Sequence, residues 1–244
     1  DLPLVRPADR PGWSPVPADE LSPLTTVDRI DHLERADLEV EGRMPWSSNA
    51  TFLVSTSLEG VNHRAIYKPI RGERPLWDFE PGLHRRERAA FLLSEHLGLG
   101  VVTPTVIRDG PLGEGSLQWF VNADHREHYF TILEQRADLH DRLRAIAALD
   151  IVANNTDRKS GHCLLADDGV WAIDNGLCFA EEFKLRTVIW EFAGEPLDES
   201  LIERLHALRA RVPLDLAVLL SEPEVEAMLE RTGELIDLGV LPHD

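Results

Sequence analysis

Cysteine is scarce in this sequence, and long apolar runs are missing. The 244 residues include two cysteines, Cys163 and Cys178, which do not form a Cys-x-x-Cys pair. So few cysteines exclude a disulfide framework and favour a reducing compartment, so we expect a cytoplasmic protein. No apolar run approaches the ~18 residues that a membrane-spanning helix needs, so we expect no membrane span.

Lysine and arginine are also few. The chain has 25 lysines and arginines against 43 aspartates and glutamates, which gives a net charge of −18. This balance argues against a nucleic-acid partner and against binding to an anionic membrane surface. The other proportions, 43% hydrophobic and 28% charged residues, are those of an ordinary globular protein.

Local patterns divide the chain into three parts. Residues 1–24 are rich in proline and predict an extended arm. Residues 25–121 predict a β-rich lobe, and residues 122–244 predict a mainly helical lobe, so we expect an α+β fold with two lobes around a cleft. The expected helices cover residues 26–35, 83–97, 138–153 and about 198–236, and the expected strands lie near 38–40, 51–55, 64–67, 101–107, 116–121, 163–165 and 170–173.

The polar loop of residues 154–162 is the most informative segment. It holds a carboxylate, two cations, an imidazole and two amides. Such a loop is usually a solvated surface, but here a short hairpin should fold Asp174, at the end of an apolar strand, back toward it. Phosphoryl transfer needs this set of groups: an acid that orients the acceptor, an acid that holds a divalent metal and a cation for the γ-phosphate.

The stretch LDIVANNTDRKSGHCLL…WAIDNGLCF resembles the catalytic and metal-binding loops of the phosphatidylinositol 3-/4-kinase-like branch of the protein-kinase superfamily. The whole chain is similar to an actinobacterial family assigned to that branch. The resemblance implies a two-lobed protein-kinase-like fold with a β-rich N-lobe, residues 25–121, and a helical C-lobe, residues 122–244. It also implies that Asp157 is the catalytic acid and that Asp174 binds the metal.

Three positions depart from the pattern of that branch, and the mildest departure is Asp174-Asn175-Gly176 in place of Asp-Phe-Gly. Lys159 stands where the branch has a histidine, and it gives the Asp-x-Lys arrangement in which the lysine contacts the γ-phosphate. His162 stands where the branch has a metal-binding asparagine. An imidazole suits Mg²⁺ less well than an oxygen ligand does, so the expected cofactors are ATP with Mg²⁺ or Mn²⁺.

In the first lobe, the resemblance implies a nucleotide site. Lys68, at the end of an apolar strand, matches the lysine that pairs with the phosphates, and Glu87 matches the glutamate that pairs with this lysine. The alternatives are a surface lysine and an ordinary helical ion pair. The remaining expected nucleotide contacts are a phosphate-covering turn (Ser47, Ser48 and Asn49) and a linker beside the adenine (Gln118, Trp119 and Phe120).

Two further polar residues should support the loop. Asp150 lies on the apolar helix before it, and a buried acid there needs partners, so we expect it to anchor the loop backbone. Asn155 should bridge loop groups with its amide. A zinc site built from His162, Cys163 and Cys178 is a rival, although its spacing lacks the short paired ligands of structural zinc.

The sequence thus predicts an ATP-dependent phosphotransferase that acts on a protein hydroxyl or a small polar metabolite. A nucleotide-binding pseudokinase with a scaffolding role is the alternative, because His162 and the Ser47–Asn49 turn depart from the kinase pattern. A metal-dependent hydrolase that uses the same acids also stays open.

Overall fold

The computed structural model describes Leu4 and residues 24–45, 49–76, 79, 81–124, 126–166 and 169–244. The chain forms two compact units. The first unit contains the described residues up to His84 together with Pro104–Phe120, and the second contains Arg85–Thr103 and Val121–Asp244. The sequence predicted that residues 25–121 form one lobe. In the structure, segment 85–103 belongs instead to the second unit. The expected arm, residues 1–24, lies almost wholly outside the described residues.

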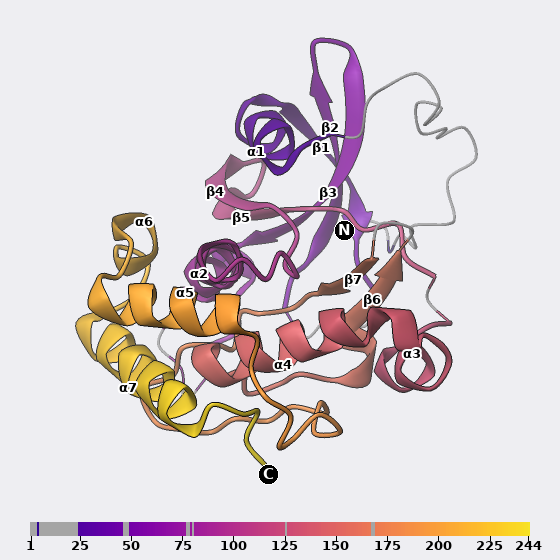
Figure 1. Ribbon diagram of the computed structural model, residues 1–244. Helices are drawn as coiled ribbons and strands as arrows, with labels where there is room; N and C mark the ends of the chain where they lie inside the picture. The colour runs from indigo at the N-terminus through magenta and orange to yellow at the C-terminus, as the bar shows by residue number, and fades with distance from the viewer. Residues whose placement is uncertain are drawn as a thin grey trace. The chain divides into compact units, whose positions relative to one another are not determined.

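A five-stranded antiparallel sheet forms the first unit, in the order β1-β2-β3-β5-β4 (Figure 1). The turn between β2 and β3 matches the expected one at Glu59 and Gly60, which both adopt the left-handed backbone conformation (φ 53° and 84°) that a tight hairpin requires. The strands are β1 (Asp37–Arg43), β2 (Phe52–Leu58), β3 (Val61–Pro69), β4 (Thr105–Gly110) and β5 (Gly113–Trp119).

Helix α1 (Thr26–Arg35) packs on this sheet and closes the core of the first unit. Its N-terminus is fixed by a capping box, in which the Thr25 hydroxyl accepts from the Asp28 N–H and the Asp28 carboxylate accepts from the Thr25 N–H. Leu33 of α1 packs with a set of buried residues from four strands: Phe52, Val54, Ala65, Tyr67, Val106 and Leu117.

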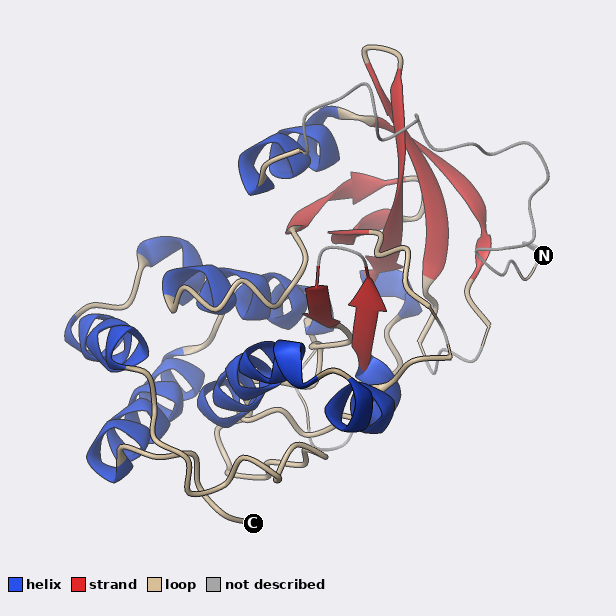
Figure 2. Cartoon of the chain, turned by 45° about the vertical axis from the view of Figure 1, so that its right-hand side comes forward, coloured by secondary structure: helices blue, strands red, loops and turns tan. Residues whose placement is uncertain are grey.

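The central element of the second unit is α4 (His140–Ala153), in which every residue from Ile146 to Ala153 is buried. Helix α7 (Glu222–Leu238) and strand β7 (Gly169–Ala172) contact it. Figure 2 shows the helices in blue and the strands in red. A helix that is apolar on all sides belongs inside a core. The other elements are α2 (Leu83–His96), α3 (Tyr129–Gln135), α5 (Glu199–Ala210), α6 (Leu214–Ala217), β6 (Cys163–Ala166) and β7 (Gly169–Ala172).

The helical end of the chain consists of three helices with identifiable boundaries. Asp198 caps α5, Pro213 precedes α6, and Ser221 caps α7 through a capping box with Glu224. The strand expected at residues 101–107 begins only at Thr105, and the Val101 carbonyl instead accepts a hydrogen bond from Ala172. Over the described ranges, no helix is both long and apolar enough to cross a membrane.

Candidate active site

The polar loop starts where α4 ends, at Asn154. This residue adopts the left-handed conformation (φ 50°) that stops a helix, and asparagine tolerates it better than most residues. The Asn155 side-chain oxygen then accepts a 2.9 Å hydrogen bond from the Asp157 N–H. The position of Asp157 is therefore set by the C-terminus of a buried helix.

Asp150 is the anchor of this loop, as expected from the sequence. Its carboxylate is fully buried and accepts hydrogen bonds from Arg158 (2.9 and 3.0 Å), the Asn155 amide (2.9 Å) and the Thr187 hydroxyl (3.1 Å). Burial opposes the charge on Arg158, but the Asp150 carboxylate outweighs this effect and raises the pKa of the guanidinium. The Arg158 guanidinium therefore stays charged in the core.

The same guanidinium joins the loop to the segment that carries Asp174. Arg158 donates to the Ile173 carbonyl at 2.7 Å and to the Asn175 side-chain oxygen at 2.6 Å. The Asn175 N–H in turn donates to the Glu87 carboxylate of α2 at 3.1 Å. Both residues are buried, so one polar network links α2, α4 and the two loops.

Asp157 and Lys159 form an ion pair at the surface of this network. The Lys159 Nζ lies 2.7 Å from the Asp157 carboxylate, and the two side chains are 64% and 32% exposed. Both groups can therefore reach a molecule in solvent, in contrast to the buried Asp150–Arg158 pair. The structure thus brings together the acid and the cation that the sequence singled out.

His162 and Asp174 also lie side by side. His162 ends a 3₁₀ turn (Ser160–His162), and its Nε2 lies 3.6 Å from the Asp174 carboxylate, which is 53% exposed. Burial is the main reason why the pKa of His162 is lowered, so the imidazole is neutral near pH 7. The charges that act on this imidazole come from Asp174, Arg158, Asp157 and Lys159.

A carboxylate and a neutral imidazole at this spacing can contribute two ligands to a divalent ion. Mg²⁺ sites commonly take one or two protein ligands and complete the shell with phosphate oxygens and water. Within the described residues, no group of three or more His, Cys, Asp or Glu side chains is arranged to hold a metal ion.

The two cysteines do not support the rival zinc site. Cys163 and Cys178 are both buried, and burial raises the pKa of Cys163 to about 12 and that of Cys178 well above its usual value. Among the described residues, these cysteines belong to no group of three or more His, Cys, Asp or Glu side chains that could hold a metal ion. They act as small apolar groups of the core.

The expected nucleotide residues of the first unit lie on or beside the sheet. Lys68 is half-buried on β3, where it pairs with Ser116 of β5. The Asn49 side-chain oxygen accepts a 3.0 Å hydrogen bond from the Arg74 N–H. Ser47 and Ser48 lie outside the described residues. Glu87 belongs to the second unit, where it holds Asn175.

The expected linker residues already make contacts within the first unit. The buried Gln118 amide donates to the Thr105 hydroxyl at 3.1 Å. The Trp119 ring packs against His63, with 4.5 Å between ring centroids, and the Phe120 N–H donates to the Arg64 carbonyl. Packing therefore accounts for part of the environment of Trp119, as is common for such aromatic residues.

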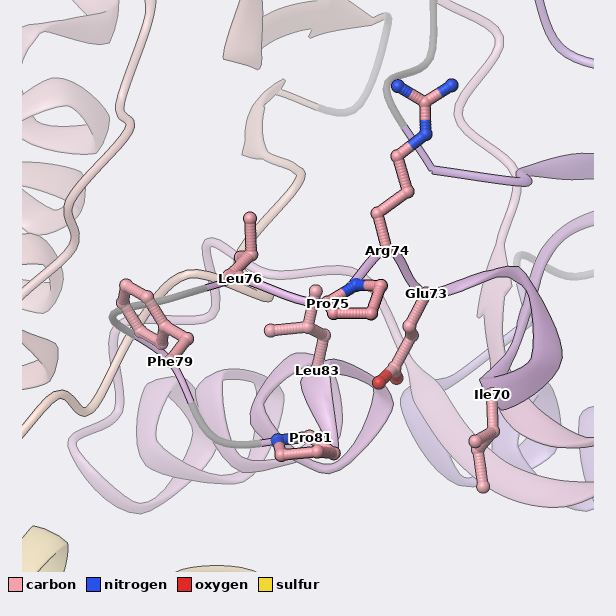
Figure 3. Close-up of a pocket in the computed structure, with 8 residues that line it drawn as sticks. All are labelled: Ile70, Glu73, Arg74, Pro75, Leu76, Phe79, Pro81 and Leu83. Carbon is pink, nitrogen blue, oxygen red and sulfur yellow. The ribbon is translucent and has the colours of Figure 1, made fainter.

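A pocket of about 270 Å³ lies in the segment between β3 and α2 (Figure 3). Pro75 and Leu83 lie between Phe79 on one side and Glu73 and Ile70 on the other, and Arg74 extends away from them. Glu73 accepts hydrogen bonds from the Gly82 and His84 N–H groups at 3.0 and 2.9 Å. These contacts fix the start of α2.

Comparison with known proteins gives one clear relative. The protein Rv2133c of Mycobacterium tuberculosis is 37% identical over 248 residues, which cover 86% of this chain and 89% of that protein. No protein-family model matches the sequence.

Among solved structures, the Golgi casein kinase with Mn and ADP bound has a TM-score of 0.54 at 15% identity, over 87% of this chain and 75% of that one. The hydra Fam20 with sugar has a TM-score of 0.53 at 13% identity, over 87% of each chain. The expected α+β, protein-kinase-like fold, with a β-sheet lobe and a helical lobe, is thereby confirmed. Its assignment to the phosphatidylinositol 3-/4-kinase-like branch stays a prediction.

Proposed function

The chain belongs to the family of the Mycobacterium tuberculosis protein Rv2133c, and we propose that it is an ATP-dependent phosphotransferase of the atypical-kinase type. One observation carries the proposal. The Asp157–Lys159 pair and the Asp174–His162 pair lie on two loops that the buried Arg158 joins, and the charges of Asp157 and Lys159 act on the His162 imidazole. The scarcity of cysteine supports a cytoplasmic location.

We propose a separate role for each exposed group. Asp157 accepts a hydrogen bond from the acceptor hydroxyl and orients it in line with the γ-phosphate. Lys159 leaves its pair with Asp157 to contact the γ-phosphate oxygens, where it stabilises the negative charge of the transition state. Phosphoryl transfer depends on positioning more than on base strength, and a loop fixed by a buried helix suits that requirement.

Asp174 and His162 would hold the divalent ion, Mg²⁺ or Mn²⁺. When bound, this ion supplies the positive charge that screens the phosphates of ATP. The neighbouring fold of the Golgi casein kinase, which was solved with Mn and ADP, supports the use of a nucleotide and a divalent metal.

Lys68 of the β-rich unit would contact the α- and β-phosphates of ATP. The turn of Ser47, Ser48 and Asn49 would cover the phosphates with backbone N–H groups. Gln118, Trp119 and Phe120 would border the adenine.

A pseudokinase is the second candidate, and the imidazole of His162 favours it because this group replaces an oxygen ligand. Thermal unfolding of the full chain should be measured with ATP alone, with Mg²⁺ or Mn²⁺ alone, and with both, followed by ATP turnover. We expect stabilisation only with ATP and metal together, and turnover that Asp174→Asn abolishes. Tight binding without turnover would establish the pseudokinase, and absence of ATP binding would overturn both candidates.

A further inference from the structure

The C-terminal turn of α4 has four backbone carbonyl groups without a partner inside the helix, as every helix end has. Two of them accept hydrogen bonds from the N–H groups of the next two residues, Asn154 and Asn155. The other two belong to Val152 and Ala153, which are fully buried, so their carbonyls need donors from elsewhere in the chain. The end of the helix that carries the polar loop is therefore completed by remote residues.

Arg231 supplies one of these donors from α7, the C-terminal helix, which packs against α4 (Figure 1). Its Nε–H donates to the Val152 carbonyl at 3.1 Å, and its Nη1 donates to the Ala180 carbonyl at 3.4 Å. The Ala153 carbonyl is satisfied by the same segment, because it accepts from the Phe179 N–H at 2.6 Å. The Arg231 side chain thus joins the end of α4 to the segment that follows β7.

Arg231 is a buried cation, and the acceptors of these two hydrogen bonds are backbone carbonyls rather than a carboxylate. Burial lowers its pKa to about 10, so the guanidinium is still charged near pH 7. The C-terminus of a helix carries a partial negative charge, and a cation placed there is stabilised. The end of α4 therefore offsets part of the cost of burying this charge.

The segment that Arg231 holds has an unusual backbone at two positions. Asp174 and Phe179 adopt the left-handed conformation, with φ of 60° and 66°, which is uncommon for an aspartate and rarer for a bulky phenylalanine. Such conformations persist only where the surrounding contacts enforce them. The Phe179 N–H is bound to the end of α4, and the next carbonyl, that of Ala180, accepts from both Arg231 and Asn154. These contacts enforce the conformation of Phe179.

The two carbonyls that Arg231 binds belong to the two segments that carry the acids of the candidate site. The first carbonyl lies before the loop of Asp157, and the second lies after the loop of Asp174. Between these points the segments bond to each other directly, since the Thr156 N–H and hydroxyl donate to the Leu177 carbonyl at 3.0 and 3.1 Å. The position of Asp174 relative to Asp157 therefore depends on how these segments are held together.

We propose that Arg231 is a positioning residue for phosphotransfer, which holds the segment of Asp174 in place beside the loop of Asp157. The inference rests on the proposed function. It gives the C-terminal helix, which lies outside the loops that resemble kinase motifs, a part in the reaction. A displacement of about 1 Å at a reacting group can lower a rate by ~10²-fold, so support at this point should govern turnover.

Arg231→Met tests this role because it removes the donors and keeps most of the apolar side chain. With the full chain, ATP and Mn²⁺, we expect kcat to fall by about tenfold or more. The metal concentration for half-maximal turnover should rise. Affinity for metal-free ATP should be unchanged, because the proposed phosphate contact, Lys68, belongs to the other unit. Arg231→Lys keeps the charge and an N–H donor, and it should recover part of the lost kcat.

Met228→Ala is the matched control, because Met228 is a fully buried apolar residue of the same helix. It should lower the midpoint of thermal unfolding and leave kcat unchanged at a temperature at which all variants are folded. Hydrogen exchange gives a readout apart from activity. The Phe179 N–H should exchange about tenfold faster in Arg231→Met than in the parent, and it should not do so in Met228→Ala.

An equal loss of kcat in Arg231→Met and Met228→Ala would overturn the proposal, because both would then act through stability alone. Parent-like kcat in Arg231→Met would overturn it as well. If Arg231→Met does not fold, Arg231→Lys is measured in its place, and parent-like kcat and metal dependence there would be the contradicting result. A parent that does not turn over ATP with metal would refute the phosphotransferase itself, and faster exchange at Phe179 would then leave Arg231 a structural role only.

Discussion

The side-chain oxygen of Asn175 accepts a 2.6 Å hydrogen bond from the buried guanidinium of Arg158. The kinase branch that these loops resemble has a phenylalanine directly after the metal-binding acid. Here a polar amide takes that place, and its backbone N–H is bound to Glu87 of α2. The segment that carries Asp174 is thus held by hydrogen bonds on two sides.

Replacing Asn175 by leucine removes the acceptor for Arg158 inside the core. We expect the free energy of unfolding to fall by about 1–3 kcal/mol, measured by denaturant titration. The metal concentration for half-maximal ATP turnover should also rise, because Asp174 is the preceding residue. Asn62→Leu, which changes an exposed asparagine of β3, is the control. Unaltered metal dependence in Asn175→Leu would show that the contact is only structural.

Asp157→Asn keeps the shape of the side chain and removes its charge. ATP binding should survive, and phosphate transfer should fall by roughly 10²-fold or more. The measurement pairs nucleotide affinity with transfer rate. Asp141→Asn is the control, at a side chain that is 96% exposed, and it should change neither the nucleotide affinity nor the transfer rate. Unchanged transfer in Asp157→Asn would contradict its role as the catalytic acid.

Lys68→Met removes the charge proposed to contact the α- and β-phosphates. ATP affinity should drop by about tenfold or more, the effect of losing ~1.4 kcal/mol of binding. Calorimetric titration with ATP and metal checks this, with the exposed Arg35→Met as a control. A variant that binds and turns over ATP like the parent would refute the assignment of the nucleotide site.

Because His162 offers an imidazole, which Mn²⁺ accepts more readily than Mg²⁺ does, we expect ATP turnover to be higher with Mn²⁺. His162→Asn supplies an oxygen ligand and should shift the ratio of the two activities toward Mg²⁺. Turnover measured in each metal gives this ratio directly. Equal activity in both metals, together with indifference to the substitution, would remove His162 from the site.

Glu73 should make the chain less stable in acid. Burial disfavours its charged form, but hydrogen bonds from the His84 ring and from the N–H groups of His84 and Gly82 outweigh burial and lower its pKa from 4.5 to about 2. Because the folded pKa is depressed, the stabilisation is fully present above pH 4.5. It is lost as the pH falls toward 2.

Glu73→Gln should therefore be less stable than the parent at neutral pH by at most about 3 kcal/mol. The difference should shrink steadily below pH 4.5, as followed by urea titration across pH. A difference that is constant from pH 7 to strongly acidic conditions would assign the loss to packing in the pocket of Figure 3 instead.

Sequence patterns predicted the parts of this fold that depend on near neighbours. The sequence predicted three such features: helix α4, the Glu59–Gly60 turn and the anchoring role of Asp150. Each follows from local periodicity or from the free-energy cost of burying a charge. The pairs Asp157–Lys159 and Asp174–His162 followed from the hairpin that returns the chain to the loop.

Contacts between distant segments could not be predicted in this way. Glu41 alternates with apolar residues as a solvent-facing strand residue would, yet it is buried against Arg64, with two N–O distances of 3.0 Å. Arg158 looked like one of two loop cations, and only the fold shows that it is a buried link between two loops. No local sequence pattern indicates which backbone carbonyl groups accept hydrogen bonds from the Asn154 side chain.

The interleaved division of the chain has a consequence for its synthesis. The chain passes between the units at 84/85, 103/104 and 120/121. The first unit has all its strands once residue 120 has left the ribosome, but Asn175 and Ala172, which bind Glu87 and Val101 of segment 85–103, are made later. Segment 85–103, which is joined at both ends to the chain of the first unit, therefore completes these contacts only after the second half of the protein has been made.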